Sequence, residues 1–306
     1  MGAVVISIDA ELAWGFHDRV APPVDRIRAA RPGWKWLIEE LDQWQLPATW
    51  AVVGHLFLDS CSGRHETLAT PPKWFDSDPG GTQTTWNNWY GPDLIAEIKD
   101  ASVSHDIGSH TFSHLSLGNS EVTPEMLRDD LTKWCELAES WGIRPGSFVY
   151  PRNVIGYRPV LADLGFRGYR GRSPVPWYEK TAFQPITKTV SLYSGGASVP
   201  IVHPRVDEFG LVDVPASLYL YGFEGSVASG ICRLVGDPIL KAARTGIETV
   251  ATEDGIFHLW LHPNNLVSSE DRRRLREILT YIDEIRRVDG LEVYTMNEVI
   301  DQYAGS

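Results

Sequence analysis

The sequence contains few cysteines and no long apolar run. Its three cysteines, Cys61, Cys135 and Cys232, are widely spaced, odd in number and without a Cys-x-x-Cys pair. This usage argues against a disulfide framework and favours a reducing compartment in which the thiols are buried or idle. No stretch approaches the ~20 apolar residues that cross a bilayer, so we expect no membrane span.

Positive charge is also scarce. The chain has 28 Lys and Arg residues against 40 Asp and Glu residues, which gives a formal net charge of -12. Nucleic-acid partners require clustered basic side chains, and the single basic run, residues 272–274, follows acidic residues as on a solvated helix face. We therefore expect no nucleic-acid partner. The first apolar run leads directly into Asp9 and not to a signal-peptide cleavage site, which predicts a cytoplasmic protein.

The chain does contain apolar, β-branched runs that alternate with helical segments. Residues 3–8 are typical of a buried parallel strand, residues 31–45 repeat apolar side chains at helical spacing, and residues 47–53 read as the next strand. A length of 306 residues is compatible with one α/β barrel. We predict a single domain, residues 1–306, folded as a distorted (β/α) barrel of about seven parallel strands, with long loop insertions at its C-terminal rim.

Two long segments interrupt this alternation. Residues 171–210 are irregular, and residues 59–92 are polar and rich in Gly and Pro but carry several aromatic side chains. A loop of this length is usually functional. Its flat side chains could stack on sugar rings, or they could simply anchor the loop to the body of the protein. The candidate substrate-binding residues are Trp14, Trp86, Trp89, Tyr90 and Asn153.

Polar side chains collect where the predicted strands end. The carboxyl ends of parallel strands in a barrel converge on one rim, so residues distant in sequence are expected to meet there. Two histidines four residues apart on a helical turn can reach one divalent ion, although such a pair alone is more often a solvated face. The strand-end residues are Asp9, Glu11, His110, His114, Arg152, Asn153 and His262.

With these residues the chain resembles the polysaccharide deacetylase family (carbohydrate esterase family 4), metal-dependent enzymes that remove N- or O-acetyl groups from glycans. Residues His110–His114 match the family's His-(Ser/Thr)-x-x-His metal motif. The family's first motif commonly reads Thr-Phe-Asp-Asp-Gly, in which the first Asp is the base and the second is a metal ligand. Here Ala10 occupies the ligand position, and the known Asp-x-Glu variation implies Asp9 as base and Glu11 as ligand. The reverse assignment of these two carboxylates stays open.

The resemblance also implies the remaining roles. The family's third motif usually reads Arg-x-Pro; this chain has Pro151–Asn153, which casts Arg152 as the residue that orients Asp9. The pair Leu261–His262 is similar to a late Leu-x-His motif and implies His262 as the general acid. The implied cofactor is one divalent ion, bound by Glu11, His110 and His114. Two imidazoles and a carboxylate suit zinc but also admit cobalt, nickel, manganese or iron.

The resemblance implies a metal-dependent carbohydrate deacetylase acting on an acetylated sugar, a nucleotide sugar or a lipid-linked glycan. One alternative is an amidohydrolase of the same fold that opens a cyclic imide or ureide, which a compact pocket would favour over an open groove. Another is a metal-free carbohydrate-binding protein, which Ala10 suggests. If the purified protein holds no stoichiometric divalent metal and chelation changes nothing, the hydrolase interpretation fails.

Overall fold

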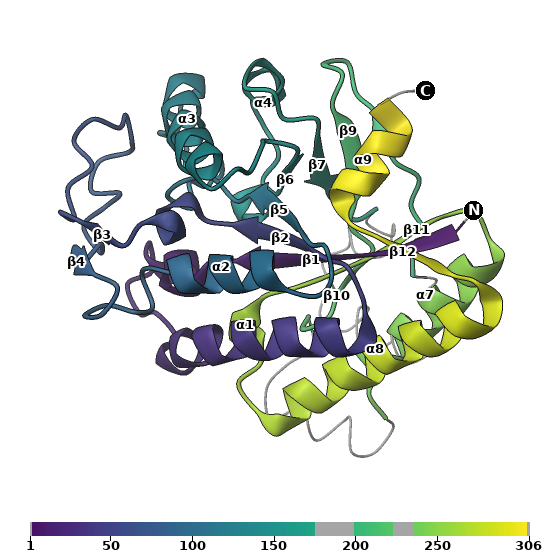
Figure 1. The fold of residues 1–306 in the computed structure, drawn as a ribbon. Helices are drawn as coiled ribbons and strands as arrows, with labels where there is room; N and C mark the ends of the chain where they lie inside the picture. Colours follow the sequence, from purple (N-terminus) through teal and green to yellow (C-terminus); the bar gives the residue numbers. More distant parts are fainter. Residues whose placement is uncertain (1, 175–198, 223–235, 305–306) are drawn as a thin grey trace, which may run out of the picture.

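The computed structural model describes residues 2–174, 199–222 and 236–304. Cys232 and part of the irregular segment 171–210 lie outside the described residues. The described strands form a curled, mostly parallel sheet that makes a half-barrel, with helices lying around it (Figure 1). The predicted distorted (β/α) barrel is confirmed.

The strand order is β10-β11-β1-β2-β5-β6-β7-β9-β8, and β12 also pairs with β1. The pairs in this sheet are parallel except for β8 with β9. A separate antiparallel pair, β3 (Ser60–Cys61) with β4 (Gly81–Thr82), lies in the long loop. The strands of the main sheet are β1 (Gly2–Ala10), β2 (Thr49–Val52), β5 (Asp106–Ser109), β6 (Ser147–Phe148), β7 (Gly168–Gly171), β8 (Arg205–Val206), β9 (Val212–Pro215), β10 (Leu218–Tyr219), β11 (Gly255–Leu261) and β12 (Glu292–Tyr294).

Helices α3, α7 and α8 each begin after a residue whose side chain caps the first turn. The Thr123 hydroxyl accepts from the amide of Met126 at 3.3 Å, as its position before a proline predicts, and Asp237 caps α7 in the same way. No helix among the described residues is long and apolar enough to cross a membrane. The helices are α1 (Val24–Trp44), α2 (Pro92–Asp100), α3 (Pro124–Ser140), α4 (Arg158–Asp163), α7 (Pro238–Thr252), α8 (Ser269–Asp289) and α9 (Met296–Ala304), with 3-10 turns η1 (Leu12–Phe16), η2 (Gly54–Phe57), η3 (Pro151–Asn153) and η5 (Pro263–Asn265).

The side chains of β1 alternate between two environments. The even-numbered ones, from Val4 to Ala10, belong to the large apolar core shared with helices α1, α2 and α3. Val5 belongs to a second core, which includes residues of α9. Because successive side chains of a strand point to opposite faces, Ser7 and Asp9 share the side of Val5. Asp9 therefore faces the inside of the half-barrel, whereas Ala10 is buried among the apolar residues on the other side.

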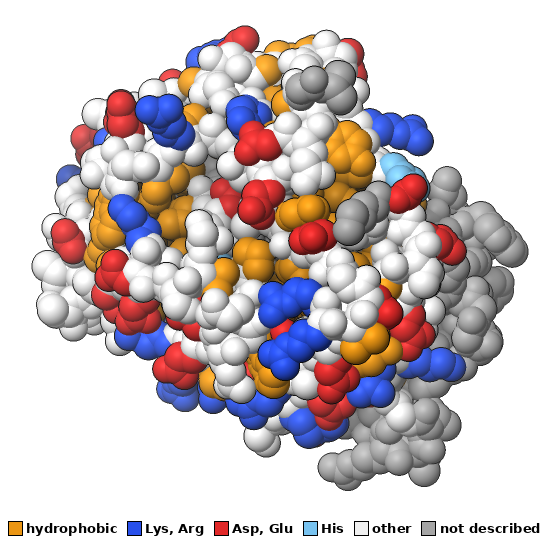
Figure 2. Space-filling model, turned by 45° about the vertical axis from the view of Figure 1, so that its right-hand side comes forward, with side chains coloured by type: hydrophobic (Ala, Val, Ile, Leu, Met, Phe, Trp, Pro, Cys, Tyr) orange, Lys and Arg blue, Asp and Glu red, His pale blue; other side chains and the backbone are white. Residues whose placement is uncertain are grey.

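The face of the molecule in Figure 2 carries acidic and basic side chains interspersed with one another. Among the described residues on this face, basic side chains do not form a continuous surface. A nucleic-acid partner would need such a surface to follow the phosphate backbone. This face therefore offers no basic patch that would suit that class of partner.

Candidate active site

A buried ion pair fixes the carboxylate of Asp9 at the end of β1. Arg170, on β7, donates from Nη1 to Asp9 Oδ1 at 2.6 Å and from Nη2 to Asp9 Oδ2 at 2.8 Å. The same guanidinium donates to Ser7 Oγ at 3.1 Å and to Asn153 Oδ1 at 2.9 Å. Arg170 and Asp9 are both buried, so this bidentate ion pair holds the carboxylate in one orientation.

The prediction that Arg152 orients Asp9 is wrong. Arg152 donates to Asp18 Oδ1 at 2.6 Å, and its side chain is 34% exposed. The backbone of Arg152 is left-handed, with φ of 56°, and the short turn η3 directs its side chain to Asp18. Period-two alternation through β7 would have identified Arg170, because Tyr169 packs into the apolar core and its neighbour must face the inside.

The surroundings of Asp9 keep its carboxylate ionised. Burial acts to raise the pKa of Asp9, but the attraction of Arg170, with smaller contributions from His110 and His262, outweighs it. The net effect is a pKa below the ordinary value for an aspartate. Asp9 is thus a fixed, charged proton acceptor at neutral pH.

Glu11, His110 and His114 converge beside Asp9, and we call them the pocket group. Glu11 Oε2 lies 3.1 Å from His114 Nε2 and 3.7 Å from His110 Nε2. One ligand atom from each residue lies within 4.8 Å of the others, and all three side chains are buried. Gly15 permits this arrangement, because a Cβ at position 15 would lie 2.1 Å from Glu11 Oε1.

The donor atoms of the pocket group suit a divalent cation. His110 Nδ1 lies 2.8 Å from the carbonyl oxygen of Val149, which can only accept, so Nδ1 carries the hydrogen. In the neutral ring, His110 Nε2 then presents a lone pair toward Glu11. Burial acts to raise the pKa of Glu11, but the neighbouring histidines, led by His262, hold it well below its ordinary value. A charged carboxylate with two imidazoles is a common ligand set for zinc.

The turn that carries the two histidines is not helical, so the prediction of a helical turn is wrong. Thr111 and His114 have left-handed backbones, with φ of 62° and 57°. Asp130, on α3, accepts from the amides of Phe112 at 2.5 Å and Ser113 at 3.1 Å and from the Ser113 hydroxyl at 2.6 Å. Burial raises the pKa of Asp130 to about 6 despite these bonds. This buried contact shapes the turn so that both imidazoles still meet Glu11.

Asp130 supports the histidine turn, a role that the sequence analysis does not predict. It is fully buried on the apolar face of α3, together with Leu127, Leu131 and Trp134. A charged residue at a helix position that should be apolar requires buried partners. The aspartate among apolar positions of α3 indicates in the sequence that Asp130 has a buried partner. It does not indicate which residue that partner is.

His262 lies at the end of β11 and faces both carboxylates. Its Nε2 is 3.6 Å from Asp9 Oδ2 and 3.8 Å from Glu11 Oε1. The Tyr219 hydroxyl lies 3.4 Å from His262 Nδ1, and Asn265 Oδ1 accepts from the His262 amide at 2.8 Å. The side chain of His262 is 19% exposed, so it is held in place but reachable from the pocket.

The side chains of His258, Trp260 and His262 share one face of β11, because successive side chains of a strand alternate between its two faces. His258 Nε2 lies 2.8 Å from Ser7 Oγ, and the Arg170 guanidinium stacks 4.4 Å from the centre of the Trp260 ring. With His262, these side chains face the same interior as Asp9. His258 is fully buried and lies within hydrogen-bond distance of Ser7 Oγ.

A cavity of about 240 Å³ connects these groups to the surface. Tyr219 and Trp260 form a stacked aromatic pair on its wall, with ring centres 4.2 Å apart. The other lining residues are Asp9, Glu11, Gly15, Phe16, Arg19, Arg26, His110, His114, Arg152, Asn153, His262 and Asn264. The pocket therefore combines charged groups with one flat apolar surface.

The aromatic residues predicted to bind substrate lie elsewhere. Trp14 and Tyr90 are fully buried, so the prediction that they contact substrate is wrong. The Trp14 indole donates to the carbonyl of Trp89 at 3.2 Å and packs edge-on against the Trp89 ring, which means that these residues anchor the loop. Trp86 is 46% exposed and does not line the pocket. Substrate contacts of Trp86 and Asn153 stay predictions.

The fold and the site define an α/β half-barrel with a pocket of carboxylates and histidines at the carboxyl ends of its strands. No protein-family model matches the sequence. No curated protein matches it either.

Among solved structures, a Mycobacterium smegmatis protein assigned as a polysaccharide deacetylase is 18% identical, with a TM-score of 0.62 over 99% of this chain and 90% of that chain. A Pseudomonas aeruginosa PAO1 protein with the same assignment is 11% identical, with a TM-score of 0.62 over 98% and 89%. An allantoinase is 10% identical, with a TM-score of 0.61 over 99% and 90%. These matches confirm the predicted resemblance at the level of the fold: the chain has the fold of the polysaccharide deacetylases.

Proposed function

We propose that this chain is a metal-dependent hydrolase that removes an acetyl group, N-acetyl in the first instance, from a sugar or glycan intermediate. The observation that supports this most is the placement of Asp9, fixed by Arg170, between the pocket group and His262. A proton acceptor, a metal-ligand set and a proton donor then share one pocket. The fold match to proteins assigned as polysaccharide deacetylases agrees with this function.

Glu11, His110 and His114 would hold one divalent ion, for which zinc is the best match to two imidazoles and a carboxylate. Such an ion acts as a Lewis acid, which lowers the pKa of water and polarises an acyl oxygen. Three protein donors leave room for substrate beside them. In this assignment Glu11 takes the ligand role that the usual deacetylase motif gives to the position of Ala10.

Asp9 serves as the general base. Because Arg170 bonds both carboxylate oxygens, the base is charged and cannot rotate away from the pocket. It accepts a proton from the water that attacks the acetyl carbonyl. Arg170 positions Asp9 through these bonds and has no direct contact with substrate in this scheme.

His262 serves as the general acid. An amine leaving group is too basic to depart unaided and requires a proton at its nitrogen. His262 Nε2 opens toward the pocket, while its backbone amide is tied to Asn265. The stacked pair of Tyr219 and Trp260 beside it offers a flat surface against which a sugar ring can pack.

The test is acetate release by the zinc-loaded protein from a panel of N-acetylated nucleotide sugars, lipid-linked sugars and oligosaccharides. We expect release from at least one member, with loss of release in Glu11→Gln and after chelation. A protein that binds no stoichiometric metal and releases no acetate would support the metal-free binding alternative.

A cyclic imide or ureide amidohydrolase is the second candidate. Two observations support this candidate: the match to an allantoinase, with a TM-score of 0.61, and the compact cavity of about 240 Å³. Both reactions use the same base, acid and metal-ligand set. Adding allantoin and hydantoin to the panel separates them, because ring opening without acetate release would replace the deacetylase assignment.

A further inference from the structure

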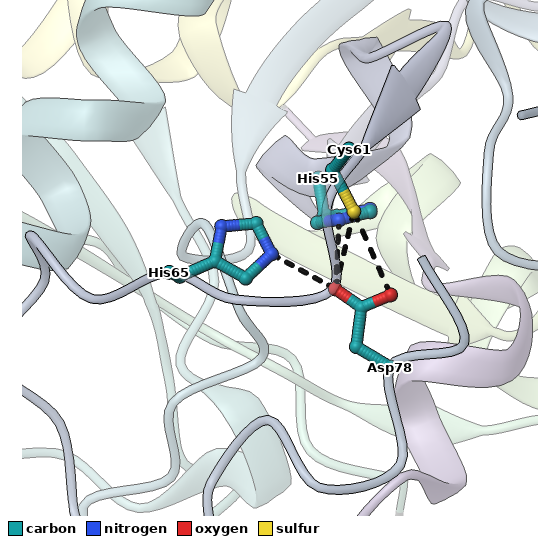
Figure 3. Close-up of side chains that lie close together, drawn as sticks. All are labelled: His55, Cys61, His65 and Asp78. Atoms are coloured by element: carbon teal, nitrogen blue, oxygen red, sulfur yellow. Dashed lines mark hydrogen bonds and ion pairs between the residues drawn. The ribbon is translucent and has the colours of Figure 1, made fainter. Parts of the chain in front are cut away.

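A second group of metal-ligand side chains lies outside the pocket, in the segment that joins η2 to α2. His55 on η2, Cys61 on β3, and His65 and Asp78 between β3 and β4 surround one point (Figure 3). One ligand atom from each lies within 4.8 Å of the others, and none of the four lines the pocket. We call these four residues the loop group. Cys61 is therefore not the idle thiol that its isolation in the sequence predicts.

One oxygen of Asp78 is the centre of the loop group. Asp78 Oδ2 lies 2.8 Å from His65 Nε2, 3.3 Å from His55 Nε2 and 3.4 Å from Cys61 Sγ. Ligand atoms around a tetrahedral zinc ion lie about 3.2–3.8 Å apart, given zinc-ligand bonds of about 2.0–2.3 Å. The separations of 3.3 and 3.4 Å fall in this range, and His65 Nε2 lies closer to Asp78 Oδ2, at hydrogen-bond distance.

His55 presents a lone pair to the centre of the loop group. Its Nδ1 lies 3.2 Å from the carbonyl oxygen of Trp89, so Nδ1 carries the hydrogen in the neutral ring and Nε2 does not. His55 Nε2 is fully buried and forms no aligned hydrogen bond with any described residue, although Asp78 Oδ2 is only 3.3 Å away. Two buried acceptors at this distance repel each other unless a cation lies between them.

The charge of the loop group also calls for a cation. The Asp78 side chain is 0% exposed, and its ion pairs among the described residues are with His55 and His65 alone. A buried carboxylate without a Lys or Arg partner is costly. An ion of charge +2 would balance Asp78 together with a Cys61 thiolate, which leaves the buried site neutral.

Further groups are placed to support the ligands. The Tyr90 hydroxyl lies 3.1 Å from Cys61 Sγ, and the Gly63 amide donates to the same sulfur at 3.3 Å. The Gly80 amide donates to the second oxygen of Asp78 at 2.9 Å. Outer hydrogen bonds of this kind orient the ligands of metal sites. They also give the buried Tyr90 a role that is unrelated to substrate.

We propose that the loop group binds one zinc ion as a structural site, separate from the pocket. A thiolate, two imidazoles and a carboxylate select zinc among common metal ions, and four protein donors leave no position for substrate. This inference does not rest on the proposed hydrolase activity. It requires only that residues 55–78 keep the arrangement described above.

The loop that this ion would hold forms part of the surroundings of the pocket group. Trp74 Nε1 donates to Ser113 Oγ at 2.9 Å, and Ser77 Oγ donates to the carbonyl of His17 at 2.7 Å. The His17 ring in turn packs edge-on against His114, with ring centres 6.2 Å apart. An ordered loop therefore supports the turn that carries His114.

The test is a cobalt titration of the whole chain, stripped of metal and kept reduced with a phosphine. Co²⁺ accepts the same donors as zinc, and a cobalt-bound thiolate absorbs in the near ultraviolet, which imidazole and carboxylate ligands do not. We expect this band to reach a plateau by two added ions per chain, because the pocket group can take up one cobalt ion without contributing to the band, and to vanish when zinc is added. The pocket group contains no cysteine, so the band reports the loop group alone.

Matched variants complete the experiment. Cys61→Ser should remove the band, whereas Cys135→Ser, on α3 and in neither group, should leave it unchanged. His65→Gln keeps the thiolate and should weaken cobalt binding by about tenfold or more. Absence of the band in the unmodified chain, its persistence in Cys61→Ser, or an unchanged titration in His65→Gln would each overturn the proposal. None of these results depends on whether the protein releases acetate.

Discussion

The pocket group and the loop group use similar side chains in different numbers. The pocket group has three donors and lines a cavity, whereas the loop group has four donors and none of them lines that cavity. Three donors leave coordination positions for reactants, and four close the coordination sphere. The number of protein donors thus distinguishes the proposed catalytic site from the proposed structural site.

The two groups also differ in what holds them. Glu11 follows β1, and the turn with His110 and His114 follows β5, both within the main sheet. The loop group lies around the two-residue pair β3 and β4, which offers little regular structure. A rigid sheet positions the pocket group before any ion binds. In the loop, by our proposal, the ion itself supplies the rigidity.

The largest effect is expected from a change that leaves both groups intact. Asp9→Asn keeps the shape of the side chain but removes the base, so we expect kcat to fall by about 10²–10⁴-fold. Metal content, measured by elemental analysis, should stay that of the unmodified protein. Loss of the pocket metal in this variant would show that Asp9 is a ligand and would reverse the roles of Asp9 and Glu11.

A second test compares Arg170 with Arg152 and determines which of the two arginines stabilises the buried carboxylate of Asp9. Arg170→Met leaves Asp9 buried without its partner and should lower the free energy of unfolding by about 3–5 kcal/mol. Arg152→Met removes a partly exposed pair and should change it by about 1 kcal/mol or less. Urea unfolding of the zinc-loaded variants measures both values. Equal effects would contradict the assignment of Arg170 as the residue that positions Asp9.

Asp130→Asn should weaken the pocket group without affecting the loop group. The amide cannot accept from three donors as the carboxylate does, so the turn from His110 to His114 loses its fixed shape. We expect zinc affinity at the pocket to fall by about 10–100-fold, as for other residues that orient metal ligands. The cobalt-thiolate band should be unchanged. A parallel loss at both groups would indicate general unfolding instead.

The smallest effect is expected at His105, which belongs to neither group. Burial lowers its pKa to about 4, and the ring accepts from the Ala48 amide at 3.2 Å. The folded pKa is below the ordinary 6.5, so protonation favours the unfolded chain. The stabilising contribution is therefore present above pH 6.5 and is lost as the pH falls toward 4. As the pH falls over this range, the urea midpoint of His105→Asn should drop less than that of the unmodified protein. Added zinc should not alter this difference between the two proteins.

The sequence predicted those features that depend on short-range patterns. Residues 3–8 form a continuous apolar, β-branched run, which indicates a buried strand of a parallel sheet. The convergence of strand ends follows from parallel topology. These rules were sufficient to bring Asp9, Glu11, His110, His114 and His262 into one pocket.

The features that the sequence did not predict depend on contacts between distant segments. Asp130, on α3, bonds the backbone of the turn from His110 to His114. Arg170 bonds Asp9 from β7, which lies beyond β6 in the sheet. The four residues of the loop group are irregularly spaced in the sequence. They come from a 3-10 turn, a two-residue strand and the loop that follows it, and no periodic pattern describes such a segment. Neither secondary-structure propensity nor the spacing of residues in the sequence predicts such contacts, because they depend on the tertiary structure.

The burial of Ala10 has a consequence for how the first motif can vary. A carboxylate introduced by Ala10→Asp would enter the apolar core beside α1 and would not reach the pocket, because β1 continues through position 10. The carboxylate that belongs to the pocket group is at position 11, the first residue after β1. Ala10→Asp is therefore not expected to supply a second carboxylate to the pocket group.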